Sequence, residues 1–366
     1  MSLATTAAAA EVLAALPGDT SGREAWRALG DAGCLAGCYQ RGDPAAGIDA
    51  GRLNATLAAA DARLTIGATL ALCVQAATPL PLLADCLGSD SPVVAGVLAG
   101  RAAVALAATD AGCGSDLPAL ATEVSVHDDH VVISGAKRWI TGATSAEYLL
   151  VLARHRPGRH FTNFTWVLVP ASAPGVRTEP ADTTLFDGSD TGHIALRDVR
   201  LPRASLVGRP GLGLASFATH IAVERLAGAQ WGVALCRRVL TDTKRRMMAR
   251  GSGDATLWHE AGLRRRFAAC LVAVRQLKAL TDELAGAVAE RHDTTAAALL
   301  KSAAATTVEL VLRECAQFQG AEGFTAGGVQ LLRAEAALWS IGGGALEVVR
   351  NVIGESADAV LADLAP

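Results

Sequence analysis

The sequence predicts an α+β fold that is mainly helical: a helical domain over residues 1–100, a β domain over 101–206 and a four-helix bundle over 207–366. Three observations support this division. Ala and Leu recur at helical spacing in the first hundred residues, short β-rich runs follow, and long amphipathic segments complete the chain. With 366 residues and 51% hydrophobic content, the chain can bury more than one core.

Pro and Gly clusters divide the first domain into its expected helices. They lie at 17–18, 42–44, 79–81 and 88–90. The apolar N-terminus is interrupted by Glu11 and has no basic region before it, so we expect no secretory signal. We also expect that no uninterrupted apolar stretch is long enough to span a membrane. The expected location is the cytoplasm.

The β domain opens with EVSV and VVISG, two runs of alternating apolar and polar residues joined by HDDH at 127–130. This pattern predicts a hairpin whose loop carries His127 and His130 as solvated residues rather than ligands. Further β-rich runs occupy 148–154, 164–170 and 193–202. We expect these runs to form an antiparallel barrel or sandwich.

The C-terminal domain should consist of four helices. Amphipathic segments occupy 216–249, 257–292, 294–320 and 346–356, and their lengths suit a four-helix bundle. The chain has no GxGxxG between a strand and a helix, so a nucleotide site must be built in another way.

Composition excludes several classes of function. The net charge is −3 and the basic residues are scattered, which argues against nucleic acid or an anionic membrane as partner. The eight cysteines form no CxxC pair and are expected to be reduced and mostly packed. Cys34 and Cys38 lie one helical turn apart without a further ligand at zinc spacing, so we expect no metal site.

Four segments carry a specific resemblance. They are TDAGCGSD at 109–116, GAKRWIT at 135–141, QFQGAEGF at 317–324 and SIGGGALEVVR at 340–350. In this order they resemble the TEPxAGSD, GxKxWIT, QxxGGxGY and IxEGTxEIxR elements of the acyl-CoA dehydrogenase family. The resemblance covers nearly the whole chain and implies FAD as cofactor, an electron acceptor for the reduced flavin, and flavin sites built from two subunits of a homodimer or tetramer.

The resemblance implies cofactor contacts from residues of all these segments and from the end of the first long helix. The expected residues are Thr109, Gly114, Ser115, Trp139, Thr141, Arg250, Gln317, Gly320, Ala345 and Glu347. The residue types agree, because hydroxyl groups can bind flavin ring edges and phosphate, and an indole offers an aromatic face. The alternative for Trp139 is a structural role in a β core. Two departures are that Ala345 replaces a family threonine and that Arg250 stands in a segment without the usual RxxFG pattern.

The family's chemistry needs a carboxylate that takes the α proton of the thioester while hydride passes to flavin N5. Gly343 occupies the usual Glu position. Isovaleryl and long-chain types instead carry the base on the first long helix in an ERLxxA stretch, and AVERLAGA here makes Glu224 the expected base. Its apolar neighbours favour burial, while the alternative is an ordinary surface glutamate.

Substrate contacts are expected from Ser115, Arg225, Gly342 and Gly343. A glycine run before a helix lets backbone N–H groups approach an oxyanion, and in the family the N–H at position 343 polarises the thioester carbonyl. This role needs no side chain, so Gly343 removes the base without removing the oxyanion site.

The Ala/Gly/Arg-rich composition and the short chain resemble acyl-carrier-protein dehydrogenases that form hydroxymalonyl and methoxymalonyl polyketide extender units. The resemblance implies a small hydroxylated acyl group on an acyl carrier protein or coenzyme A, with hydride leaving a carbon that bears oxygen. Two alternatives stay open: a flavin monooxygenase on the same fold, and a non-catalytic acyl- or carrier-binding protein.

Overall fold

A computed structural model describes residues 4–252 and 255–365. Contacts group the chain into two compact units, Met1–Glu224 and Arg225–Pro366, and the boundary falls within the long helix α7 (Gly213–Ala249). The finer division at residues 100 and 206 stays a prediction.

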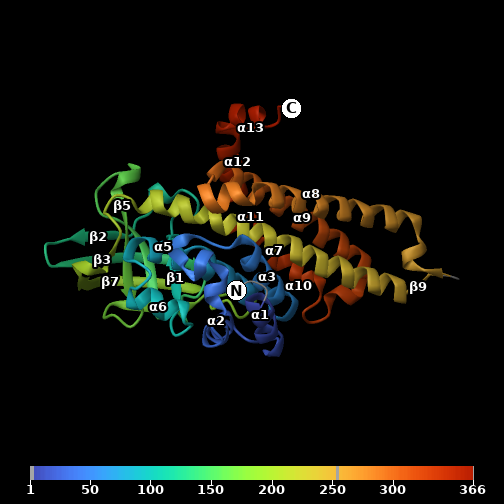
Figure 1. Ribbon diagram of the computed structural model, residues 1–366, viewed down its shortest axis with the longest axis horizontal. Coiled ribbons are helices and arrows are strands. Elements are labelled where there is room, and N and C mark those ends of the chain that lie inside the picture. Colours follow the sequence, from blue (N-terminus) through green and yellow to red (C-terminus); the bar gives the residue numbers. More distant parts are fainter. Residues whose placement is uncertain (1–3, 253–254, 366) are drawn as a thin grey trace. The chain divides into compact units, whose positions relative to one another are not determined.

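Among the described residues, six helices begin the first unit, and the Pro and Gly clusters lie at their boundaries as expected, except between α3 and α4, where residues 64–65 contain neither Pro nor Gly (Figure 1). They are α1 (Ala4–Ala15), α2 (Gly22–Asp31), α3 (Ala50–Arg63), α4 (Ile66–Ala77), α5 (Pro79–Leu87) and α6 (Pro92–Leu98). Side chains fix their starts. Ser21 and Glu24 form a capping box on α2, and the Thr65 hydroxyl accepts the Ala68 N–H at the start of α4.

Two stretches have the length and hydropathy of a membrane span, contrary to expectation: Ile66–Leu87, which comprises α4 and α5, and Thr294–Phe324. In their most apolar windows, 83% and 61% of the residues are buried inside the protein. Buried core helices pass the same test of length and composition, so these stretches are weak evidence for a membrane.

The sheet of the first unit is mixed rather than wholly antiparallel. Its strands are β1 (Val104–Ala107), β2 (Glu123–Val126), β3 (His130–Ile140), β4 (Tyr148–Arg154), β5 (Phe164–Pro170), β6 (Val176–Pro180), β7 (Gly192–Pro202) and β8 (Leu206–Val207). The order is β6-β7-β3-β2-β4-β5-β8, and β1 pairs with β4. The β1–β4 and β2–β4 pairings are parallel, and the others are antiparallel.

The predicted hairpin is confirmed. Val126 pairs with Val131 across β2 and β3, and the His127 N–H donates to the His130 carbonyl oxygen at 2.9 Å. Apolar residues alternate into one core, which includes Val131, Ile133 and Val151. Strands β1, β6 and β8 of this sheet were not predicted.

The second unit contains the rest of α7 and the helices α8 (Ala261–Arg291) and α9 (Thr294–Gln319), which pack along one another (Figure 1). The shorter elements are β9 (Gly251–Ser252), β10 (Ala255–Thr256), α10 (Val329–Glu335), α11 (Leu338–Ile341), α12 (Leu346–Glu355) and α13 (Ala357–Asp363). His292 in the left-handed region ends α8, and the Asp293 carboxylate caps α9. The four predicted helices correspond to α7, α8, α9 and α12.

The cysteines behave as expected. All eight are thiols, and six of them are buried.

Candidate active site

A buried ion pair joins the two cofactor segments expected in the first unit. Lys137 of β3 places Nζ 2.5 Å from Asp110 Oδ1 and also donates to the carbonyls of Ala108 and Leu152 at 3.0 and 2.7 Å. The side chains of Lys137 and Asp110 are 0% and 3% exposed. The pair therefore fastens the loop that follows β1 onto β3.

Backbone groups complete the coordination of Asp110. Its carboxylate accepts the Ala121 N–H at 2.6 Å, the Thr122 N–H at 2.7 Å and the Thr122 hydroxyl at 2.9 Å. Burial lowers the pKa of Lys137, whereas the Asp110 carboxylate favours its charged form. Sequence analysis gave neither residue a role, although a lysine inside an apolar alternating strand was the available signal.

Gly135 is required where the strand approaches Thr122. Its φ is +155°, and a Cβ there would lie 2.4 Å from the Thr122 hydroxyl oxygen. The first glycine of GAKRWIT is thus explained by packing alone.

Trp139 is not a core residue, so the structural alternative for it is wrong. It lies in the irregular end of β3 with a φ of +55°, and 57% of its surface is exposed. The backbone N–H of Trp139 donates to His193 Nδ1 at 3.2 Å, and the rings of the two residues meet edge to face. A non-glycine residue held at positive φ with an exposed ring is suited to contact a planar ligand.

The remaining cofactor residues of this unit lie on the same segments. The hydroxyl residues Thr109, Ser115 and Thr141 are half-buried, and Gly114 is exposed with open space at its Cβ position. Half-exposed hydroxyls, an uncrowded glycine and an exposed indole fit the edges, phosphates and ring face of a flavin nucleotide. That these residues bind it stays a prediction.

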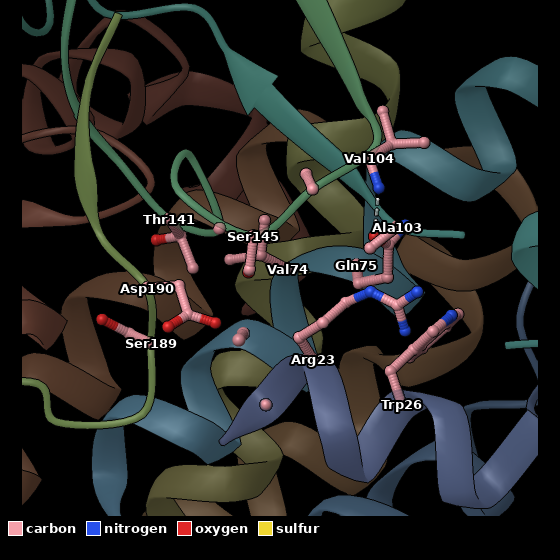
Figure 2. A pocket seen from close by; sticks show the side chains of 14 residues that line it. Arg23, Trp26, Val74, Gln75, Ala103, Val104, Thr141, Ser145, Ser189 and Asp190 are labelled. Carbon is pink, nitrogen blue, oxygen red and sulfur yellow. Dashed lines mark hydrogen bonds between the residues drawn. The ribbon is translucent and has the colours of Figure 1, made fainter. Parts of the chain in front are cut away.

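A cavity lies against Thr141. Figure 2 shows Arg23, Trp26 and Gln75 on one side of this cavity and Thr141 and Asp190 on the other. Arg23 Nε and Gln75 Nε2 are buried donors without a hydrogen-bond partner among the described residues. In proteins, such donors are satisfied by ordered water or a ligand oxygen.

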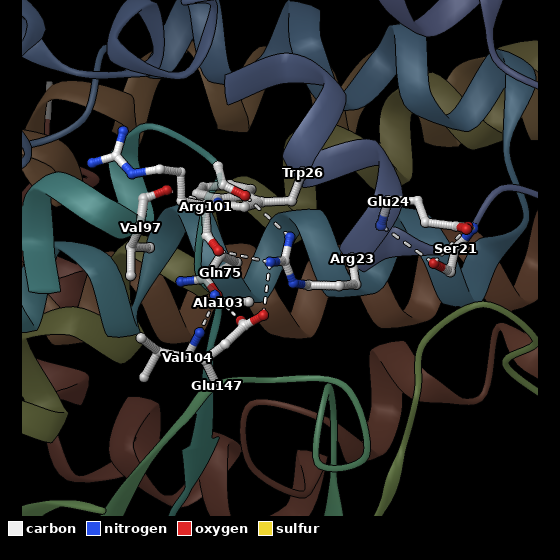
Figure 3. A network of polar contacts seen from close by, with 11 residues as sticks. Ser21, Arg23, Glu24, Trp26, Gln75, Val97, Arg101, Ala103, Val104 and Glu147 are labelled. Carbon is white, nitrogen blue, oxygen red and sulfur yellow. Dashed lines mark hydrogen bonds and ion pairs between the residues drawn. The ribbon is translucent and has the colours of Figure 1, made fainter. Parts of the chain in front are cut away.

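The other donors of Arg23 tie α2 to the sheet. Its guanidinium donates to the carbonyls of Gly100 and Arg101 and pairs with Glu147 at 2.8 Å (Figure 3). Glu147 also accepts the Ala103 N–H at 2.7 Å. The network holds the start of β1 and the segment that follows Thr141 in fixed positions.

Glu224 is half-buried on α7, between the buried residues Val223 and Leu226. The Thr78 hydroxyl, at the junction of α4 and α5, donates to Glu224 Oε2 at 2.6 Å. Burial and, to a lesser extent, the charge of Glu224 raise the pKa of the Cys73 thiol, which places Cys73 near the carboxylate. An ordinary surface position for Glu224 is therefore wrong, while its role as base is untested.

A second polar pair lies one turn earlier on α7. His220 is 4% exposed, and its Nε2 lies 3.1 Å from Asp85 Oδ2 on α5. Two contacts, His220 with Asp85 and Glu224 with Thr78, thus join this face of α7 to the α4–α5 region.

In the second unit, two cations hold the glycine run. Arg225 Nε donates to the Gly343 carbonyl oxygen at 3.1 Å, and Lys301 Nζ donates to the carbonyl oxygen of Gly342. Gly343 and Gly344 have φ values of +70° and +104°. The structure therefore brings together the predicted substrate residues Arg225, Gly342 and Gly343, and adds Lys301, which sequence analysis missed.

The cofactor residues expected in the second unit fall into two groups. Arg250 Nη1 lies 3.5 Å from the Cβ position of Gly320, and Gln317 is exposed in the last turn of α9. Ala345 precedes α12, and Glu347 is exposed in its first turn. Ser115 and Glu224 belong to the first unit, whereas both of these groups belong to the second.

Comparisons with known proteins agree with the sequence motifs. Residues 105–199 match the family model described as acyl-CoA dehydrogenase, middle domain, and residues 211–357 match acyl-CoA dehydrogenase, C-terminal domain. The acyl-[acyl-carrier-protein] dehydrogenase MbtN of Mycobacterium sp. (strain MCS) is 33% identical over 267 residues, which are 69% of this chain and 66% of that protein. The probable acyl-CoA dehydrogenase YdiO of Escherichia coli (strain K12) is 28% identical, over 62% and 60% of the two chains. The chain thus spans just under two thirds of these curated relatives.

Solved structures are similar over nearly the whole chain. Butyryl-CoA dehydrogenase from Megasphaera elsdenii has a TM-score of 0.88 at 18% identity and covers 97% of each chain. A probable acyl-CoA dehydrogenase from Mycobacterium abscessus has a TM-score of 0.89 at 23% identity, over 97% of this chain and 98% of that one. At these identities the likeness establishes the fold.

Proposed function

Because this chain belongs to the acyl-CoA dehydrogenase family, we propose that it is an FAD-dependent dehydrogenase that oxidises a small acyl thioester. The observation that carries the proposal is Glu224, a half-buried carboxylate among apolar residues whose Oε2 accepts the Thr78 hydroxyl. Glu224 takes the α proton of the thioester. FAD, when bound, supplies the hydride acceptor.

The glycine run supplies a site for the developing negative charge. The carbonyl oxygens of Gly342 and Gly343 are bonded to Lys301 and Arg225, so these oxygens are turned toward cations. The Gly343 N–H polarises the thioester carbonyl, and Arg225 and Lys301 hold the loop that carries it. Ser115 is a further contact of the substrate.

The flavin is bound by residues of both units. Thr109, Gly114, Ser115, Trp139 and Thr141 bind it within one subunit. The exposed residues Arg250 and Gln317, with Gly320, reach the flavin of a second subunit in a homodimer or tetramer, and Ala345 and Glu347 are further flavin contacts. The Arg250–Gly320 contact supports a shared role for these two residues.

The thioester is carried on an acyl carrier protein, with coenzyme A as the alternative carrier. The name of the relative MbtN, an acyl-[acyl-carrier-protein] dehydrogenase, supports this choice. The acyl group is small and hydroxylated, the setting is cytoplasmic polyketide extender-unit biosynthesis, and an external acceptor reoxidises the flavin.

The test is anaerobic mixing of the yellow protein with acyl thioesters on coenzyme A and on a carrier protein, followed by flavin absorbance. Glu224→Gln should retain flavin and lose bleaching by substrate. Glu309→Gln is the matched control, since Glu309 is an exposed glutamate on α9. Bleaching of Glu224→Gln at the wild-type rate would refute the assignment of the base.

The same preparation separates the alternatives. A flavin monooxygenase would show reduced flavin that reacts quickly with oxygen and needs no thioester. A non-catalytic acyl- or carrier-binding protein would be purified without flavin absorbance and would not take up added FAD.

A further inference from the structure

We infer that Thr78 is a positioning residue that holds the Glu224 carboxylate for proton removal. The inference rests on the proposed role of Glu224 as base. It concerns a contact between residues 146 positions apart, with 2.6 Å between the hydroxyl oxygen and Oε2.

The backbone of Thr78 is already occupied by the helices on either side. Its N–H donates to the Val74 carbonyl at 3.0 Å, and its carbonyl accepts the Leu82 N–H at 3.0 Å. Its backbone angles are φ −125° and ψ −72°, outside the extended form usual for a helix-capping residue. The residue is therefore fixed in place before its side chain makes any contact.

The hydroxyl does not cap the helix it precedes. Thr65, at the equivalent position before α4, accepts the Ala68 N–H at 3.0 Å, whereas the Thr78 side chain makes no cap bond to α5. Pro79 opens α5 and has no N–H, so this helix begins with one donor fewer to satisfy. The Thr78 hydroxyl is directed to Glu224 instead.

Thr78 is also fully buried, so water does not compete for this bond. The nearby titratable and charged groups, in space or along the chain, are Cys73 of α4, the pair of His220 with Asp85 of α5 one turn earlier on α7, and Arg225, the next residue in the sequence. His220 is bonded to Asp85, and Arg225 Nε is bonded to the Gly343 carbonyl. Thr78 thus donates to Glu224 as a buried, neutral donor on a backbone that is held by two helices.

A donated hydrogen bond has two consequences for a base. It stabilises the ionised carboxylate, so the group stays ready to accept a proton at lower pH. It also restricts the carboxylate to one orientation, which keeps the reacting oxygen in place.

The experiment compares Thr78→Val with Thr78→Ser by the pH dependence of anaerobic flavin bleaching at limiting thioester. Valine keeps the shape of threonine and removes the hydroxyl donor. The acidic limb of the pH profile should therefore move up by about one pH unit, so that the bleaching rate at pH values below this limb falls about tenfold. Serine keeps the donor and should restore the wild-type limb. Flavin content and thermal midpoint report any loss of folding.

Thr69→Val is the matched control. Thr69 is equally buried on α4, and its hydroxyl donates to the Thr65 carbonyl of its own helix at 2.9 Å. The pH profile of this variant should equal that of the wild type. A wild-type acidic limb in Thr78→Val, or an equal displacement in Thr69→Val, would overturn the inference.

The Glu224→Gln variant separates the two levels of the proposal. If Glu224→Gln bleaches normally, the base has been misassigned and the role of Thr78 fails with it. If Glu224→Gln is inactive while Thr78→Val keeps the wild-type profile, the base stands and the inference about Thr78 alone is wrong.

Discussion

Replacing Lys137 by methionine removes the cation of the buried pair while keeping a long apolar side chain. Asp110 is then left 3% exposed without its cation, and the carbonyls of Ala108 and Leu152 each lose a donor. Breaking a buried ion pair from one side costs about 3–5 kcal/mol. Asp110 keeps three other hydrogen-bond donors, so the lower end, about 3 kcal/mol, is expected.

A second substitution should recover much of this loss. In Lys137→Met/Asp110→Asn, an amide oxygen at the Oδ2 position still accepts the Ala121 and Thr122 N–H groups. The amide nitrogen at Oδ1 can donate to the Thr122 hydroxyl. No buried charge remains in this double variant. Replacing both partners of a buried ion pair by neutral groups costs far less stability than removing only one partner.

Urea unfolding at saturating FAD measures these free energies, because ligand bound to the folded state must be held constant. The control is Arg154→Met, which breaks the exposed pair of Arg154 with Glu123 in the same sheet and should cost less than about 1 kcal/mol. A Lys137→Met variant within about 1 kcal/mol of the wild type would refute the reasoning, as would a double variant less stable than the single one.

Three further predictions concern other sites. Burial raises the pKa of Glu147, but hydrogen bonds from Arg23 and a backbone N–H outweigh burial, so the pKa is lowered from 4.5. The ionised carboxylate therefore stabilises the fold above pH 4.5, and this stability should be lost as pH falls through the lowered pKa. Glu147→Gln should remove this pH dependence from acid unfolding curves. Trp139→Ala should change unfolding free energy by less than about 0.5 kcal/mol, since the ring is exposed, yet weaken FAD binding about tenfold in titrations of apoprotein; unchanged affinity would exclude a cofactor contact. Gly344→Ala should lower the free energy of unfolding by about 1–2 kcal/mol, because the φ of Gly344 is +104° and the new Cβ would lie 3.2 Å from Arg225 Nη2. Flavin bleaching should be slower at unchanged flavin content, and a wild-type thermal midpoint would contradict this prediction.

Local patterns were sufficient wherever structure depends on neighbours in sequence. The hairpin at 127–130 followed from alternation on both sides of a polar loop, and the helix boundaries near Pro79 and Gly88 followed from residues that end helices. Strand β1 was missed because VALA is equally compatible with helix, and its parallel pairing with β4 depends on distant residues.

The motifs named the candidate site residues but not the contacts that support them. The structure brings Arg225 to Gly343 and Arg250 to Gly320, contacts that the motif positions did not specify. The contacts of Lys137 with Asp110 and of Lys301 with Gly342 could not be predicted from spacing either, because the two partners lie 27 and 41 positions apart in the sequence. Such pairs are determined by the packing of whole elements.

The glycine at 343 also bears on how this enzyme could evolve. Its φ of +70° costs about 1–2 kcal/mol for any residue with a Cβ, and Arg225 holds its carbonyl in that conformation. A mutation that placed glutamate at this position would therefore begin as a destabilised variant, before any advantage of the new side chain could be selected. Descendants of this chain should therefore keep glycine at position 343 more strictly than the residues on either side of the loop.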